Sequence, residues 1–269
     1  HFSYKFSPKT EMLLGYSKRI NRPRRHQLNP FSNYSDPYTL QRGNPFLMPE
    51  IIHLTELSYL RFWKKFNLNT TIYHRFIKDL HRRNLINEGA YSTVEFTNLG
   101  SSHLTGADLI LTYRPVKQVR ITSSTSVYNT STKDEEITGG EYQNYFGMNT
   151  NLMASLRLKT WSFQIQGDYS SRRYVLLGEI VPQYALGIGL RKQLMDGKLT
   201  IGVRATDLFK TRQFGFESYD LGNYFFNTYR NWESRTVFLS VSYNFGKMVQ
   251  GKQKRRSVSG DAAPLRAGR

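Results

Sequence analysis

The stretch Phe146–Lys159, with the sequence FGMNTNLMASLRLK, decides the fold of this chain. Alternate positions from Phe146 onward are mostly apolar, and the positions between them carry mainly Gly, Asn, Ser, Arg and Lys. Successive side chains of a strand point to opposite faces, so this period of two predicts a strand with one apolar and one polar face. The same alternation recurs in Gly106–Arg114, Leu199–Thr206 and Val237–Phe245, and no long window shows a comparable helical period. The chain is therefore predicted to be all-β.

The connections between these strands alternate in length. Short turns are expected near Pro8–Thr10, Trp63–Lys65, Pro115–Lys117, Lys159–Thr160 and Asp196–Gly197. The last is an Asp-Gly pair, a strong hairpin signal. Long polar segments separate these turns, and they cover Ile20 to Pro49, His81 to Gly100, Thr130 to Gln143, Ser171 to Pro182 and Lys210 to Glu233. Short turns at one end of the sheet and long loops at the other are typical of bacterial outer-membrane barrels.

We expect eleven strands, most of them long enough to cross a bilayer at a tilt. They cover Phe2–Ser7, Glu11–Ile20, Glu50–Phe62, Phe66–Leu80, Ser101–Arg114, Gln118–Asn129, Asn144–Leu158, Trp161–Arg173, Ile180–Leu194, Lys198–Arg212 and Ser234–Gly246. The predicted fold is an antiparallel transmembrane β-barrel. Single-chain bacterial barrels have an even strand number, so an odd count suggests further strands upstream of His1, in a barrel of about 22 strands.

Charge and composition narrow the functional classes. The net charge is +18, but the segment Lys247–Arg269 holds seven Lys and Arg against one acid, Asp261. We therefore divide the chain into a barrel part, residues 1–246, and a basic, disordered periplasmic tail, residues 247–269. A second basic cluster, Lys18–Arg25, lies where a strand enters a long loop. Because the charge sits in these places, we do not expect nucleic-acid binding. The chain has no Cys, which excludes disulfides and thiolate chemistry.

Alternation alone also fits a soluble β-sandwich that turns its apolar face inward. Three features favour the membrane barrel over that alternative. The strands are long, and the charged residues Asp108, Arg114, Arg157 and Arg204 are suited to a wet lumen. The third feature is a gathering of aromatic residues beside the short turns, as in a membrane-interface girdle. These residues are Phe62, Trp63, Phe66, Tyr113, Trp161 and Phe245.

Three segments resemble the C-terminal barrel of TonB-dependent receptors, within the outer-membrane β-barrel protein family. The segment Gln41–Glu50, QRGNPFLMPE, is similar to a signature that leads from a long loop into a barrel strand. The segment Arg204–Phe209, RATDLF, resembles part of the penultimate strand. The segment Ser240–Lys247, SVSYNFGK, resembles the closing strand. The matching positions, which we interpret as structural, are Gly43, Asn44, Pro45, Pro49, Glu50, Asp207 and Phe245.

The resemblance implies a receptor in the outer membrane of a Gram-negative bacterium that imports a scarce nutrient, either a metal chelate or an oligosaccharide. Its partners would be outer-membrane lipid and lipopolysaccharide, a plug domain, an energy-coupling complex and the transported ligand. A complete small porin of ten or twelve strands, or a soluble β-protein that binds glycan or nucleic acid, stays open as an alternative. An open sheet exposes two unpaired edges, so we expect no stable monomer in water without detergent.

No residue pattern nominates a catalytic, cofactor or metal site, and we expect no enzymatic activity. The six histidines have no paired ligand spacing, although a metal site could still assemble in three dimensions. The acidic run Asp134–Glu136 is interpreted as a solvated turn rather than a calcium site. Three functional alternatives remain: Asn44 or Glu50 could touch substrate or plug, the Lys18–Arg25 cluster could bind lipopolysaccharide phosphates, and Asn223–Arg230 could stack on sugars or chelates.

Overall fold

The computed structural model describes residues 1–31, 39–87, 92–133, 140–175, 178–219 and 227–245. These residues form sixteen strands, one α-helical turn, α1 (Arg25–Leu28), and one 3₁₀ turn, η1 (Met195–Gly197). No helix within these ranges is long and apolar enough to cross a membrane. The basic segment 247–269 and the acidic run Asp134–Glu136 lie outside the described residues.

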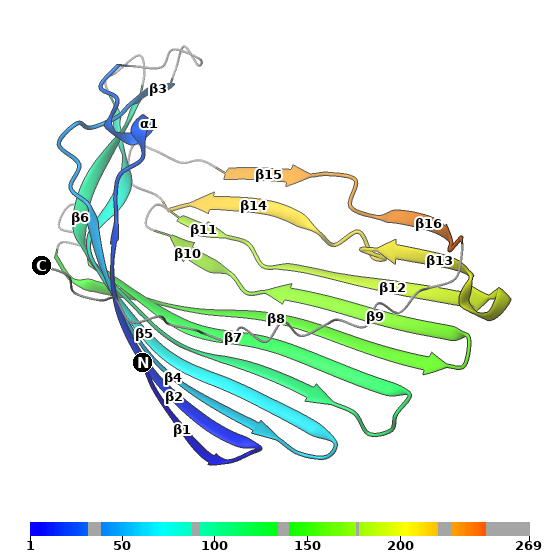
Figure 1. Cartoon of the computed structure of the whole chain (residues 1–269). Helices are drawn as coiled ribbons and strands as arrows, with labels where there is room; N and C mark the ends of the chain where they lie inside the picture. Colours follow the sequence, from blue (N-terminus) through cyan, green and yellow to red (C-terminus); the bar gives the residue numbers. More distant parts are fainter. Residues whose placement is uncertain (32–38, 88–91, 134–139, 176–177, 220–226, 246–269) are drawn as a thin grey trace, which may run out of the picture.

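Eleven strands follow one another as antiparallel neighbours in a single curved sheet (Figure 1). They are β1 (Phe2–Ser7), β2 (Thr10–Asn21), β4 (Glu50–Phe62), β5 (Phe66–Asn87), β6 (Ser92–Tyr113), β7 (Val119–Lys133), β8 (Tyr142–Leu158), β9 (Trp161–Ser170), β12 (Gln183–Leu194), β13 (Leu199–Thr206) and β16 (Thr236–Tyr243). The eleven predicted strands and their antiparallel arrangement are confirmed. Among the described strands, β1 and β16 each pair on one side only, so the sheet is open.

Several segments expected to be loops are ordered. The hairpin of β5 and β6 is much longer than predicted, because each strand has 22 residues and runs past the ends of its neighbours. A short strand, β3 (Thr39–Arg42), pairs in parallel with the projecting part of β6. A second sheet of four strands forms from β10 (Arg173–Val175), β11 (Gly178–Ile180), β14 (Gln213–Ser218) and β15 (Asn227–Asn231), beside the long-loop end of the main sheet (Figure 1).

Two predicted strand boundaries are wrong for identifiable reasons. The strand expected over Lys198–Arg212 ends at Thr206, because Asp207 adopts a positive φ of 44° that breaks the extended backbone. The strand expected over Ile180–Leu194 begins at Gln183, directly after Pro182. Proline has no backbone N–H to give to a strand ladder, so the interruption at this position is expected.

The molecule has almost no hydrophobic interior. Among the described residues, only Leu47, Val181 and Ala185 are both apolar and buried. Many large apolar side chains of the main sheet are exposed, such as Ile165 and Val237, which are 52% and 69% exposed. A sandwich would have buried one face of this sheet against another. The single layer instead presents an apolar face that requires a nonaqueous solvent.

Candidate functional site

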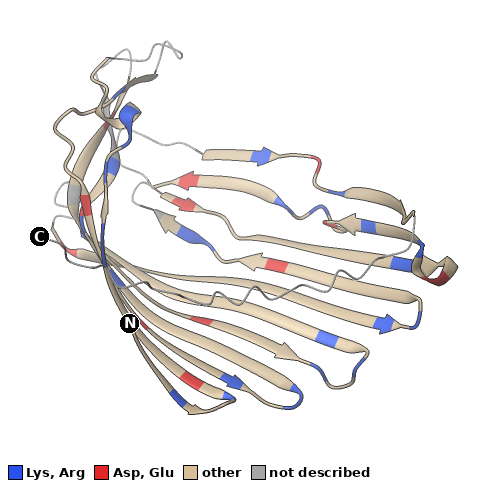
Figure 2. Cartoon of the chain, viewed as in Figure 1, with Lys and Arg blue, Asp and Glu red and all other residues tan. Residues whose placement is uncertain are grey.

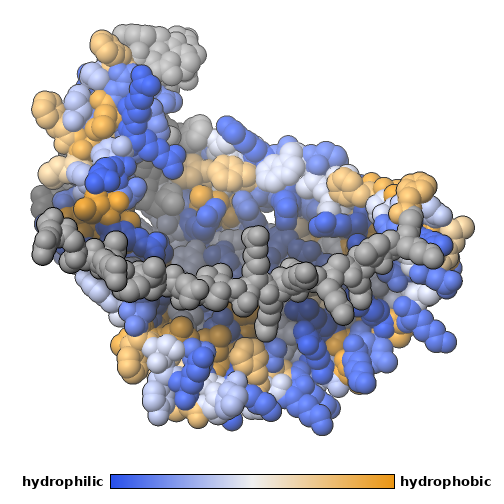
Figure 3. Space-filling model, viewed as in Figure 1, coloured by the Kyte–Doolittle hydropathy of each residue, from blue (hydrophilic) through white to orange (hydrophobic). Residues whose placement is uncertain are grey.

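The two faces of the main sheet differ in chemistry because the alternation of neighbouring strands stays in phase. One cross-strand row joins Ile165, Ile188, Ala205 and Val237 through β9, β12, β13 and β16. The adjacent row, on the opposite face, joins Gln164, Gly189, Arg204 and Phe238. In Figure 3, hydrophobic patches alternate with hydrophilic residues over the lower strands. We call the polar face the inner wall and the apolar face the outer wall.

Three of the four charges predicted to face a lumen lie on the inner wall. Asp108, Arg157 and Arg204 all occupy positions in phase with Gln164 and Gln166 through the strand registers. Arg114 follows the last residue of β6 and belongs to a short turn. Figure 2 shows further Lys and Arg residues along this short-turn edge of the sheet. The inner phase therefore carries the charged strand residues named here.

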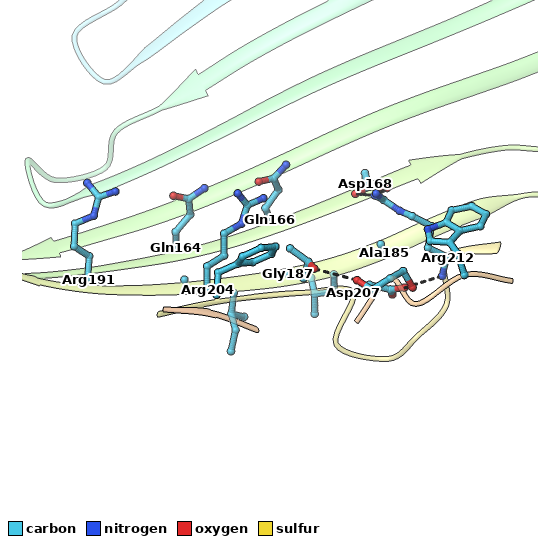
Figure 4. Close-up of a pocket in the computed structure, with 16 residues that line it drawn as sticks. Gln164, Gln166, Asp168, Ala185, Gly187, Arg191, Arg204, Asp207 and Arg212 are labelled. Carbon is cyan, nitrogen blue, oxygen red and sulfur yellow. Dashed lines mark hydrogen bonds and ion pairs between the residues drawn. The ribbon is translucent and has the colours of Figure 1, made fainter. Parts of the chain in front are cut away.

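The inner wall is hollowed over β9, β12 and β13 to form a concavity of about 600 Å³ (Figure 4). Its polar lining comes from Gln164, Gln166, Asp168, Arg191, Arg204 and Arg212. Gly187 and Gly189 also line it, and their missing side chains leave space between the neighbouring strands. A Cβ atom at Gly189 would meet only ordinary contacts, with Gln164 Cβ at 3.8 Å and Val203 O at 4.0 Å. A side chain can therefore begin at Gly189 without displacing a neighbour.

The concavity carries an excess of positive charge. Arg212 Nη2 donates hydrogen bonds to both carboxylate oxygens of Asp168, each at 2.8 Å. Neither Arg191 nor Arg204 forms an ion pair with any residue that the structure describes. Guanidinium groups recognise carboxylate and phosphate groups through several parallel hydrogen bonds. The lining is therefore suited to a polar ligand with anionic groups, or to acidic residues of another domain.

Asp207 lies at one rim of this concavity, where its carboxylate accepts the hydrogen bonds of a turn. Its carboxylate accepts hydrogen bonds from the Thr211 and Arg212 backbone N–H groups at 2.9 and 3.0 Å, and from the Thr211 hydroxyl at 3.0 Å. The Ser234 hydroxyl donates a further bond to it. Burial would raise the pKa of the Asp207 carboxyl, but the bonds from Ser234, Thr211 and Arg212 outweigh burial and lower the pKa to about 2. Asp207 is thus an ionised anchor at the end of β13.

The QRGNPFLMPE segment is held against the projecting part of the β5–β6 hairpin. The Gly43 and Asn44 backbone N–H groups donate to Asn29 O and Gln27 O at 2.8 and 2.7 Å. A Cβ atom at Gly43 would lie 2.6 Å from Asn29 O, so only glycine allows this approach. The Asn44 side-chain oxygen accepts the Phe46 N–H at 2.9 Å, which shapes the turn around Pro45.

Glu50 is the first residue of β4 and connects this strand to its two neighbours by hydrogen bonds. It is 7% exposed, and its carboxylate accepts hydrogen bonds from Asn21 Nδ2 at 2.6 Å and from the His81 backbone N–H at 2.7 Å. Asn98 adds to this connection, because its side chain exchanges two hydrogen bonds with the Met48 backbone at 2.7 and 2.9 Å. The polar groups of Asn44 and Glu50 are therefore engaged within the chain. Phe245 follows β16 and is 90% exposed.

A tyrosine cluster lies above the inner wall, between the main sheet and the second sheet. The rings of Tyr145 and Tyr174 stack with centroids 5.3 Å apart, and both residues line a second hollow of about 200 Å³. Burial raises the pKa of the nearby Tyr219, and the hydroxyls of Tyr145 and Tyr174 add to this effect. Arg172 contacts Glu179 and, at 3.4 Å, Glu217 from the second sheet. Aromatic faces beside charged groups suit sugars or planar ligands.

Apart from Arg204 and Asp207, the sequence did not single out the polar residues that line either hollow. Only their phase in the alternation could have indicated them, because Arg212 and Asp168 come together from positions 44 residues apart. Of the proposed stacking segment Asn223–Arg230, residues 223–226 lie outside the described part. The remainder begins β15, where the Tyr229 hydroxyl donates to Glu217. Among the described residues, no group of three or more His, Asp or Glu side chains could hold a metal ion.

Proteins of known family and known structure share this architecture. The model of the outer membrane protein beta-barrel family matches residues 1–243. No curated protein matches the sequence. Solved structures do match: the ferric enterobactin receptor of Pseudomonas aeruginosa is 16% identical with a TM-score of 0.65, and 90% of this chain covers 39% of that one. The copper transporter OprC is 10% identical with a TM-score of 0.68, and 90% of this chain covers 38% of it. The FrpB iron transporter of Neisseria meningitidis is 12% identical with a TM-score of 0.58, with the same coverage.

Proposed function

This chain belongs to the outer membrane protein β-barrel family and lies in the outer membrane of a Gram-negative bacterium, and from this premise we propose that it serves nutrient import. The motif resemblance to the C-terminal barrel of TonB-dependent receptors supports this proposal, and so does the fold that the chain shares with the ferric enterobactin receptor and the copper transporter OprC. The chain spans 39% of the length of the ferric enterobactin receptor. In our proposal it supplies about half of a barrel of about 22 strands, and the rest of that protein supplies the plug and the coupling segment.

The observation that carries the proposal is the unpaired positive charge inside a polar hollow. Arg191 and Arg204 have no ion-pair partner among the described residues, and they lie on neighbouring strands of the inner wall, where Arg204 pairs with Gly189 and Arg191 with Gly202. Unpaired guanidinium groups favour anionic partners. A metal chelate with carboxylate or phenolate groups would meet this requirement, and so would acidic side chains of a plug domain. An oligosaccharide would instead use the tyrosine cluster. The role of the chain is transport and binding, without catalysis.

The apolar outer wall and the open edges of the sheet argue against the two alternatives, a soluble β-protein and a complete small porin. A soluble β-protein would have to cover the apolar outer wall, and the family places the chain in a membrane instead. A complete small porin would close its sheet, whereas the described strands end in two open edges at β1 and β16. A porin would also pass its solutes by diffusion, which separates it from energy-coupled import in an experiment.

The test uses the full-length gene product in its own cells. A strain with the gene disrupted is complemented with the native gene or with an Arg191→Gln/Arg204→Gln variant. Uptake of iron-55 citrate and of radiolabelled maltoheptaose is then measured with and without a protonophore. We expect the native gene to restore protonophore-sensitive uptake of one probe, and the variant to reduce it at unchanged protein level. Uptake that ignores the protonophore would show a diffusion pore and overturn the proposal.

A Gly189→Trp variant separates the hollow from its charges. The indole would occupy the concavity, because Gly189 lines it and a Cβ atom there would meet only ordinary contacts. If the hollow receives the ligand, uptake falls in this variant as well. The matched control is Gly167→Ala, which adds a methyl group to the outer wall of β9, where a Cβ atom would meet only ordinary contacts. Normal uptake with a filled hollow would move the ligand pathway away from this part of the wall.

A further inference from the structure

The outer wall carries a basic patch at its long-loop edge that neither hollow explains. The patch consists of Lys18, His53, His74, Lys78 and His103, which come from four neighbouring strands. One cross-strand row joins Lys18, His53, Phe76 and His103. Lys78 belongs to the next row toward the long loops, and His74 to the row below. We call this set the outer basic patch.

The imidazoles of the patch are linked to one another through neighbouring hydroxyl groups and the Phe76 ring. The Tyr16 hydroxyl and His53 Nδ1 are 2.8 Å apart. His74 Nε2 lies 3.4 Å from His103 Nδ1, and the Tyr142 hydroxyl lies 3.4 Å from His103 Nε2. The ring of Phe76 lies between the imidazoles, with its centroid 4.7 Å from that of His103. The imidazole and hydroxyl groups can each donate a hydrogen bond, and they lie on a surface that faces away from the lumen.

No acid lies beside this patch on its own face. Along the outer-wall positions of β2 and β4 through β8, the only acid among the described residues is Glu95, which lies eight residues beyond His103 on the projecting part of β6 and forms an ion pair with Arg42 at 3.4 Å. The nearby acids Glu50, Glu56 and Asp108 occupy the inner phase. Arg19, from the basic cluster of the sequence, also has the inner phase, so the structure divides that cluster between the two walls. The charge at this edge of the outer wall is therefore uncompensated.

The position of the patch relative to the apolar surface indicates which kind of ligand it binds. Four residues below the row of His53, toward the short turns, the outer wall carries the apolar row Leu14, Leu57 and Ile72. At about 3.3 Å for each residue, roughly 13 Å separates these two rows along the strand. An amphiphile with phosphates at one end and acyl chains at the other matches this order. Because long loops face the cell exterior, the patch lies at the outer leaflet.

We propose that the outer basic patch binds the phosphate groups of lipopolysaccharide, with the acyl chains of its lipid A lying on the apolar row below. Lys18 and Lys78 supply charge, and the imidazoles supply hydrogen bonds to phosphate oxygens. This inference rests on the outer-membrane location and does not depend on which nutrient, if any, the barrel imports. An interface girdle without lipid specificity is the competing explanation, and it predicts no dependence on phosphate.

The test measures lipid A binding to the full-length protein in neutral detergent, with bisphosphorylated lipid A, enzymatically dephosphorylated lipid A and phosphatidylglycerol as probes. We expect Lys18→Gln/Lys78→Gln to weaken binding of bisphosphorylated lipid A by about tenfold to thirtyfold, since each lysine near a charged membrane surface contributes on the order of 1 kcal/mol. Lys18→Arg/Lys78→Arg should retain binding. The matched control, Arg61→Gln/Lys192→Gln, removes two cations of the same wall at the short-turn edge, where they stack on Trp63 and Trp161.

A second variant guards against misfolding. His53→Gln/His103→Gln leaves the lysines in place and should weaken binding of the phosphorylated probe alone. Heat modifiability on gels confirms that each variant forms a barrel. Equal binding of phosphorylated and dephosphorylated lipid A, or an equal loss in the short-turn control, would overturn the proposal. Tight patch-dependent binding of phosphatidylglycerol would overturn the assignment to lipopolysaccharide.

Discussion

Replacing Asp207 should destabilise the rim of the inner hollow by an amount that the structure allows us to work out. The carboxylate accepts four hydrogen bonds, two from backbone N–H groups and two from the Thr211 and Ser234 hydroxyls. Its pKa falls from 3.8 to about 2. At about 1.4 kcal/mol for each pKa unit, ionised Asp207 contributes at most about 2.5 kcal/mol to folding.

The two simplest substitutions should differ in size. Asp207→Asn keeps one acceptor oxygen and loses the charge, so we expect a cost of about 2 kcal/mol. Asp207→Ala also leaves the donors of Thr211, Arg212 and Ser234 without a partner, which brings the cost to about 3 kcal/mol. Asp196→Asn is the matched control, because Asp196 is an exposed turn residue with a positive φ of 53° that asparagine tolerates.

The assay is urea unfolding of the full-length protein in lipid vesicles, followed by tryptophan fluorescence. Because the folded pKa is lower than the unfolded one, the contribution of Asp207 is complete above about pH 4 and disappears as the pH falls through 2. The native protein should therefore lose more stability between pH 4 and pH 2 than Asp207→Asn does. If Asp207→Ala unfolds within 0.5 kcal/mol of the Asp196→Asn control, or if both pH profiles run parallel, the reasoning is refuted.

Two further predictions concern the loop and the membrane face. Gly43→Ala should expose the segment before Pro49 to proteases while the barrel stays heat-modifiable, because the added methyl group would lie 2.6 Å from Asn29 O; unchanged cleavage would contradict this. Ile165→Arg should cost about 2–4 kcal/mol in bilayer unfolding experiments, since Ile165 lies on the outer wall well inside β9. Gln166→Arg, one residue along on the inner wall, should be nearly neutral, and equal costs at the two positions would disprove the assignment of the faces.

The strands of the main sheet were predictable because their signal is local. Phe146–Leu158 shows its two faces in its own residues, and the Asp-Gly pair at 196–197 marks its own turn. The projecting ends of β5 and β6 were not predictable in this way. They extend beyond β4, where no apolar face is required, and they gain the pairing with β3 from a segment some 50 residues away. A polar sequence in that position is therefore predicted to be a loop.

The inner hollow could be predicted from the sequence only in part. The phase of Arg204 on the polar face follows from the sequence, as do those of Asp108 and Arg157. Whether that face has a hollow at a given residue depends on the side chains that the strand register places next to that residue. Arg204 pairs directly with Gly189, and Gly189 pairs with Gln164. The glycine leaves the space, and the register, which no single segment contains, places the arginine beside it.

A single-layer wall also explains how the fold persists when the sequence changes. Only three buried apolar residues occur in the described part of the chain, so little jigsaw packing has to be conserved. The sheet is held by its backbone ladder, which any residue except proline can supply. An alternating pattern and a set of turns are then enough, which accounts for TM-scores of 0.58 to 0.68 at 10% to 16% identity. The inner phase is left free to vary, so the polar residues of the inner wall can change while the outer wall stays apolar.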